Sequence, residues 1–84
     1  MQIPDTGTRA DEIRAWLRDR VADLLGVPAG QVETGADLGD YGLDSVYGLT
    51  LTAEIEDHLG VVLEPTVIWD HPSIDALTAY LVAR

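Results

Sequence analysis

"YGLDSVYGLTLTAEIEDHLG", residues 41–60, carries the clearest helical pattern in the chain and sets the architecture around it. Apolar residues recur in this segment at the three- and four-residue spacing of one helix face. The predicted buried face consists of Val46, Leu49, Leu51, Ile55 and Leu59. The helix is expected to begin at Asp44 or Ser45 and to end at Gly60, because glycine readily adopts the left-handed conformation that closes helices.

An earlier apolar stripe predicts a first helix of about four to five turns. Its members are Ile13, Trp16, Leu17, Val21, Leu24 and Leu25. Thr8 followed by Asp11 is typical of a helix start with an acidic first turn, and Gly26 with Pro28 ends the helix. Residues 1–7 are expected to form a flexible lead-in, and the single domain is expected to cover residues 8–84.

Residues 27–43 contain four glycines and a proline and show no sustained period. A loop of this length in a small domain is usually functional or held in place by its own side chains. Val32, Leu38 and Leu43 are therefore expected to anchor the loop to the core. The first two helices are thus joined by a long crossover.

"VVLEPTVIWDHPS", residues 61–73, is rich in β-branched residues, but Pro65 argues against a strand. Thr66 is expected to cap a single short helical turn that Pro72 ends, and Ser73 is expected to cap a last helix. The inward-facing residues of that helix are Ile74, Leu77, Tyr80 and Leu81. The expected fold is all-α: a small four-helix bundle with three longer helices, one short helix and a long loop between helices one and two.

The chain is strongly acidic, with fifteen carboxylates against five arginines and a net charge of −10, and residues 21–83 contain no Lys or Arg. Such a field repels nucleic acid and anionic lipid and attracts basic protein surfaces, although it also fits a surface that only keeps a domain soluble. No apolar run is long enough to span a membrane, and the N-terminus lacks the pattern of a secretory signal. With no cysteine, disulfides and thiolate metal sites are excluded, and a cytoplasmic setting is expected.

Catalytic and metal-binding patterns are weak. His58 and His71 have no evident serine or cysteine partner in the sequence. His58 is interpreted as a structural residue near the end of the second helix, and His71 as a turn residue before Pro72. Asp37, Asp40 and Asp44 are spaced by three and four residues, whereas a calcium loop needs ligands at alternate positions. We therefore predict no catalytic residue and no metal site.

Ser45 allows two interpretations. Serine is favoured at helix starts, where its hydroxyl accepts a hydrogen bond from an early backbone N–H. Asp44, however, offers an anionic cap and makes Ser45 redundant in that role. The N-terminus of a helix also favours an added anion, such as a phosphoester on the serine hydroxyl. From position alone, Ser45 is either a cap or a hydroxyl suited to carry phosphate.

"GLDSV" at residues 42–46 and "LEPTVIWDHPSIDALTAYL" at residues 63–81 resemble the acyl carrier protein and thiolation domains of polyketide, fatty acid and nonribosomal peptide assembly, above all the polyketide synthase type. The likeness covers residues 13–81. It implies that Ser45, flanked by Asp44, receives 4'-phosphopantetheine from coenzyme A through a phosphopantetheinyl transferase. The thiol of that arm would carry acyl groups as thioesters, which agrees with a chain that has no thiol of its own.

The resemblance also implies that the second helix and the loop before it dock onto basic-surfaced biosynthetic enzymes, such as a ketosynthase, an acyltransferase or an acyl-activating ligase. The matching positions are Asp40, Asp44, Val46, Glu54, Glu56 and Asp57. The acidic positions also fit an ordinary solvated helix face. The carrier is expected to be a monomer whose docking is transient and salt-sensitive.

Two alternatives stay open beside the acyl carrier. A peptidyl or aryl carrier would differ only in cargo, but its usual signature has two glycines before the aspartate–serine pair. An unmodified acidic helical adaptor would use the same negative surface. The chain departs from the common carrier pattern at Thr50, where many carriers have glutamate, and at Trp69, where phenylalanine is commoner. Gly48 inside a helix costs about 0.5–1 kcal/mol relative to alanine.

Overall fold

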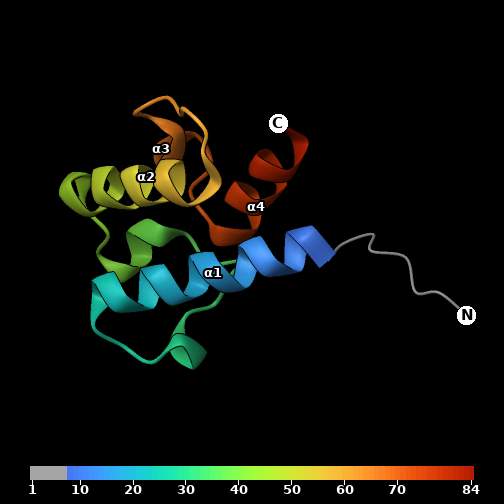
Figure 1. The fold of residues 1–84 in the computed structure, drawn as a ribbon. Coiled ribbons are helices and arrows are strands. Elements are labelled where there is room, and N and C mark those ends of the chain that lie inside the picture. The colour runs from blue at the N-terminus through green and yellow to red at the C-terminus, as the bar shows by residue number, and fades with distance from the viewer. Residues whose placement is uncertain (1–7) are drawn as a thin grey trace, which may run out of the picture.

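The structure, a computed structural model, describes residues 8–84, and over these residues its regular elements are all helical. They are α1 (Thr8–Leu25), the 3-10 turns η1 (Ala29–Gln31) and η2 (Leu38–Tyr41), α2 (Ser45–Leu59), α3 (Val67–Asp70) and α4 (Ile74–Ala83). Figure 1 shows α2 and α4 packed over α1, with the short α3 against α2. The predicted all-α bundle of three longer helices and one short helix is confirmed. The lead-in predicted at residues 1–7 lies outside the described residues.

The predicted stripe of α1 supplies one side of the core. Ile13, Leu17 and Val21 are buried, and Gly26 ends the helix with a positive φ of 71°. α1 includes Thr8 itself, with Asp11 in its first turn. An ion pair between Arg14 Nε and Asp75 Oδ1, 2.9 Å apart, joins α1 to α4 beside this apolar contact. No helix of residues 8–84 combines the length and apolar character needed to cross a bilayer.

The long loop is anchored as predicted. Val32, Leu38 and Leu43 are all buried in the core. Backbone hydrogen bonds add to these anchors: Leu38 N–H donates to the carbonyl of Pro72 at 2.7 Å, and Asp75 N–H donates to that of Thr34 at 2.9 Å. The loop is therefore fixed to the α3–α4 connection and to the first turn of α4, although most of it lacks regular structure.

The prediction for the buried face of α2 was partly wrong. Leu51 and Ile55 are fully buried, but Val46 and Leu49 are 67% and 54% exposed. A helix turns by about 100° per residue, so Leu49 lies about 160° and Val46 about 140° around the axis from Leu51. The positions that complete the buried face are instead Gly48 and Thr52, and Gly60 ends the helix with a φ of 68°.

The C-terminal elements follow the prediction with two differences. Ser73 Oγ accepts a hydrogen bond from Ala76 N–H at 3.0 Å and caps α4, as expected. Thr66 precedes α3 but does not cap it, because its hydroxyl donates to Asp70 Oδ2. Of the residues predicted to face inward, Ile74, Leu77 and Leu81 are buried. Tyr80 is only partly buried, and its ring stacks on that of His71 at a centroid distance of 4.4 Å.

Candidate functional site

Ser45 is the first residue of α2, and its side chain is exposed. The cap of this helix is Asp44, whose Oδ1 accepts a hydrogen bond from Tyr47 N–H at 3.0 Å. Within the described part of the chain, the Ser45 hydroxyl neither donates nor accepts a hydrogen bond. The interpretation of Ser45 as the helix cap is therefore wrong, and its hydroxyl is available for chemistry.

The turn before α2 presents this hydroxyl to solvent. Asp37 Oδ1 accepts a hydrogen bond from Gly39 N–H at 2.7 Å and starts η2. Gly42 follows η2 with a φ of 80°, a left-handed conformation that side-chain-bearing residues rarely adopt. This reversal directs Leu43 into the core, where it is 3% exposed, and brings the next two residues back to the surface. Ser45 is thus held between a buried anchor and a capped helix.

The local electrostatics fit a phosphodiester at Ser45. The N-terminus of α2 carries the positive end of the helix dipole. Helix geometry leaves the first N–H groups, those of Ser45 and Val46, without an intrahelical acceptor. The free oxygens of a phosphate whose phosphorus is bonded to Ser45 Oγ would lie close to these donors. Because the serine is exposed, a bulky group on Oγ needs no rearrangement of the core.

An apolar surface lies beside Ser45. Gly48 is buried one turn further along α2, and Trp69 from α3 covers it: a Cβ built on Gly48 would stand 3.2 Å from Trp69 Cζ2. Trp69 itself is 46% exposed. This neighbour was missed by the sequence reasoning, which noted Trp69 and Gly48 separately. A glycine in a helix opposite an aromatic residue of another helix was the available signal.

The six predicted docking residues separate into two groups. Asp40, Asp44 and Val46 are exposed and lie within a few residues of Ser45. The other three, Glu54, Glu56 and Asp57, lie further along α2, and Glu54 is about 14 Å from Ser45 along the helix axis. Glu54 Oε1 lies 3.3 Å from Arg20 Nε, and Glu56 Oε2 accepts a hydrogen bond from Leu63 N–H at 2.7 Å. The Asp57 side chain is exposed.

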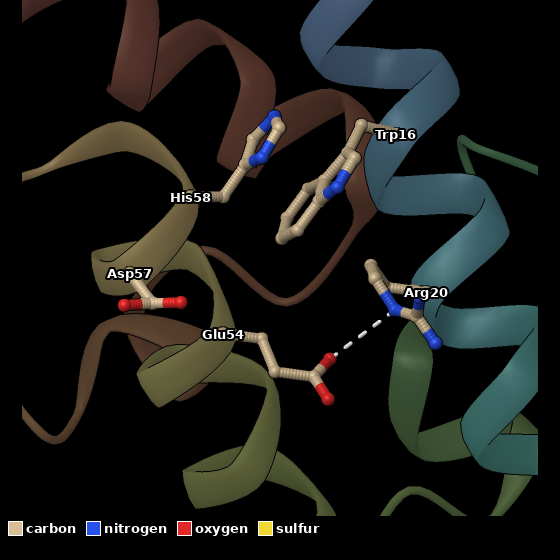
Figure 2. Close-up of a pocket in the computed structure, with 5 residues that line it drawn as sticks. All are labelled: Trp16, Arg20, Glu54, Asp57 and His58. Carbon is tan, nitrogen blue, oxygen red and sulfur yellow. Dashed lines mark ion pairs between the residues drawn. The ribbon is translucent and has the colours of Figure 1, made fainter.

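A shallow pocket of about 290 Å³ lies between α1 and α2 (Figure 2). Trp16, Arg20, Glu54, Asp57 and His58 line it. The rings of Trp16 and His58 stack with centroids 4.2 Å apart and planes 4° from parallel. His58 follows Ser45 by about 20 Å along α2. This stack joins α1 to the last turn of α2 and has no contact with the serine hydroxyl.

The histidines and carboxylates form no further centre in the described residues. His71 stacks on Tyr80, as His58 stacks on Trp16. Between residues 8 and 84, no three His, Asp or Glu side chains gather closely enough to hold a metal ion. The arrangement around Ser45 therefore offers one accessible nucleophile and no neighbouring imidazole hydrogen-bonded to it.

Comparison with known proteins gives one consistent family. A family model described as the phosphopantetheine attachment site matches residues 15–81. The acyl carrier protein LipD from Actinoplanes friuliensis is 53% identical and superposes with a TM-score of 0.75, over 99% of this chain and 92% of its own. A free-standing peptidyl carrier protein from an uncharacterized Acinetobacter baumannii secondary metabolic pathway is 35% identical with a TM-score of 0.85, over 88% and 92%.

A polyketide synthase is among the relatives. A phenolphthiocerol/phthiocerol polyketide synthase of Mycobacterium tuberculosis is 35% identical over 72 residues. That match covers 86% of this chain but only 4% of the synthase. The family model covers α2 and α3 and most of α1 and α4, and the chain superposes on carrier proteins. The chain therefore belongs to the phosphopantetheine attachment-site family and is a carrier domain for 4'-phosphopantetheine.

Proposed function

We propose that this domain carries acyl groups, polyketide intermediates among them, as thioesters on a 4'-phosphopantetheine arm attached to Ser45 Oγ. One observation carries the choice of residue. Ser45 is exposed and unbonded at the N-terminus of α2, while Asp44 performs the capping role that a serine there would otherwise fill. The chain's only other serine, Ser73, accepts a hydrogen bond from Ala76 N–H and is committed to capping α4.

The arm, when bound, supplies the thiol that this cysteine-free chain lacks. Ser45 acts once as a nucleophile: its Oγ forms a bond to phosphorus as the nucleotide part of coenzyme A leaves, and its proton goes to a base. Between residues 8 and 84 no histidine or carboxylate is hydrogen-bonded to that oxygen. We propose that the phosphopantetheinyl transferase supplies this base and that the domain acts as its substrate.

Docking onto partner enzymes is proposed to centre on Asp40, Asp44 and Val46. Val46 offers an exposed apolar contact beside Ser45, and the two carboxylates suit the basic surface of a transferase, ketosynthase, acyltransferase or acyl-activating ligase. Exposed ion pairs contribute about 0–1 kcal/mol each, so such docking is weak and salt-sensitive. Asp57, with Glu54 and Glu56, belongs to the outer part of this surface, and the latter two already contact groups of their own chain.

The likeness to the Acinetobacter peptidyl carrier favours aminoacyl cargo as the second candidate. The two candidates share the arm and Ser45 and differ only in what the thiol carries. Offering the modified domain to an acyl-activating ligase and to an amino-acid-activating enzyme separates them by the mass of the product. In either case, a monomer in the cytoplasm is part of the proposal.

Intact mass spectrometry tests the attachment residue directly. Wild-type protein incubated with coenzyme A, Mg²⁺ and a promiscuous transferase is expected to gain the mass of one phosphopantetheine. Ser45→Ala is expected to gain nothing. Ser73→Asn is the matched control, since asparagine preserves the cap and the variant should be modified like the wild type. A wild-type protein that stays unmodified would instead favour the acidic adaptor.

A further inference from the structure

Trp69 occupies an unusual position for a large apolar side chain in this domain. It belongs to the single turn of α3 and is 46% exposed, whereas its neighbours Val67 and Ile68 are 2% and 1% exposed. The buried part of its ring is held against α2, because Gly48 leaves room where a Cβ would stand 3.2 Å from Trp69 Cζ2. The indole is thus fixed along one side and open on the other.

The fixed side places the indole next to Ser45. Residues three apart on a helix share a face, so Ser45 and Gly48 lie one above the other. A Cα–Cβ bond in a helix tilts toward the helix N-terminus, and the surface that a residue covers lies over the preceding turn. Atoms close to the position that a Cβ on Gly48 would occupy therefore lie over the helical turn that starts at Ser45. Trp69 provides those atoms.

Over residues 8–84, buried side chains fill the interior of the bundle. The side chains between α2, α3 and α4 are closely packed, with Leu51, Ile55, Ile68 and Leu77 each at most 1% exposed. The 290 Å³ pocket is lined by residues of α1 and by residues 54–58 of α2, and His58 follows Ser45 by about 20 Å along the axis. A chain tethered at Ser45 can therefore reach the open side of Trp69 without entering the core, and the exposed Val46 and Leu49 of α2 extend the apolar surface there.

We propose that Trp69, seated on Gly48, is the binding surface for the aliphatic part of the group that Ser45 carries, and that this group lies outside the bundle. The proposal rests on the attachment to Ser45 proposed above. The flat indole gives large contact area to methylene and methyl groups, and tethering makes even a weak contact effective because the encounter is intramolecular. Asp44 beside Ser45 and Asp70 beside Trp69 leave the surroundings acidic, so the site suits neutral acyl chains better than anionic ones.

The two tryptophans permit a test with an internal control. In ¹⁵N-labelled protein, their indole N–H resonances can be assigned with Trp16→Phe and Trp69→Phe and compared in the unmodified, phosphopantetheinylated and octanoyl-loaded forms. The Trp69 resonance is expected to shift, more for the octanoyl form than for the arm alone. The resonance of Trp16, which lies on α1 against His58 in the last turn of α2, is expected to stay in place. Intact mass establishes that each form is fully loaded.

Fluorescence and the cargo itself give independent readouts. In the Trp16→Phe variant, the acrylamide quenching constant of Trp69 is expected to fall on octanoyl loading, because a chain over the open side of the indole shields it from the quencher. The terminal methyl of the octanoyl group is expected to move upfield under the indole ring current. That upfield shift should disappear in Trp69→Ala, which removes the ring without touching Ser45.

The outcomes separate the two proposals. Full loading by mass with no change in Trp69 resonance, quenching or methyl shift overturns the Trp69 surface and leaves the attachment at Ser45 standing. Loading that instead shifts the methyl resonances of Leu51, Ile55 and Leu77 overturns it too, because the cargo would then enter the core. Equal shifts at both tryptophans also count against it. A wild-type chain that gains no mass overturns both proposals together.

Discussion

Asp44 and Ser45 are adjacent, and either side chain could cap a helix. Only the Asp44 side chain does so here. The Asp44 carboxylate accepts a hydrogen bond from Tyr47 N–H at 3.0 Å, and its carbonyl accepts one from Gly48 N–H at 2.8 Å. Those two contacts start α2 without any contribution from the serine side chain. Because the aspartate starts the helix, the serine hydroxyl can be modified without loss of a structural hydrogen bond.

This division predicts different effects of truncating the two side chains. Asp44→Ala is expected to lower the free energy of unfolding by about 1 kcal/mol, the usual cost of losing an N-cap. Ser45→Ala is expected to change it by less than about 0.5 kcal/mol, as for a surface substitution away from any such contact. Urea titration of both variants measures the difference. Equal losses would show that Ser45, contrary to the structure, shares the cap.

The connection from α2 to α3 is held by a carboxylate that the sequence suggested for docking. After Gly60 turns the chain, Glu56 Oε2 accepts a hydrogen bond from Leu63 N–H at 2.7 Å. That bond directs Leu63, which is 6% exposed, into the core. Glu56 therefore sets the path of the chain toward α3, and through it the position of Trp69. Its acidity alone gave no indication of this role, because a hydrogen bond seven residues away depends on the turn between.

Replacing Glu56 separates its structural role from its charge. Glu56→Ala leaves the part-buried Leu63 N–H without its acceptor, and it is expected to lower the free energy of unfolding by about 1–3 kcal/mol. Glu56→Gln keeps an acceptor oxygen and is expected to lose clearly less. Thermal unfolding of both variants measures the two costs. If glutamine and alanine destabilise the domain equally, the negative charge rather than the hydrogen bond holds the loop.

The molecule as a whole has too few cations for its carboxylates, and most of those cations are engaged within the fold. Arg14 pairs with Asp11 and Asp75, Arg20 with Asp23 and Glu54, and Arg18 Nε donates to the Val32 carbonyl. The remaining negative charge is spread over the loop, α2 and the C-terminal part of the chain. Repulsion among these carboxylates opposes compactness, while their field attracts basic partners.

Added salt is therefore expected to stabilise this domain. Between about 0.01 M and 0.1 M NaCl the screening length falls from about 30 Å to about 10 Å, which removes most of the repulsion across the molecule. A gain on the order of 1 kcal/mol corresponds to a rise in Tm of about 4–8 °C for a domain of this size. Calorimetry at both salt concentrations measures it. A falling Tm would mean that the arginine ion pairs outweigh the repulsion.

The helices, their glycine stops and the three loop anchors were all predictable, because each depends on local periodicity and conformational preference. The Ser73 cap followed from the same local rules, which also offered Asp44 as a cap for α2 beside Ser45. Val46 and Leu49 were wrongly assigned to the buried face of α2, because the helical period places them on the side of the helix opposite Leu51. Sequence alone therefore predicted a four-helix bundle with Ser45 at the start of its second helix, and the carrier function was what the family resemblance implied.

Contacts between distant segments were decided only by the folded molecule. The packing of Trp69 on Gly48, the Glu56–Leu63 hydrogen bond and the Trp16–His58 stack each join residues from different elements or across a turn. Their geometry depends on how the helices cross and on the path of irregular loops, neither of which leaves a periodic trace in the sequence. The surface beside Ser45 is for this reason a property of the tertiary structure, whereas the serine's place on α2 is a property of the chain.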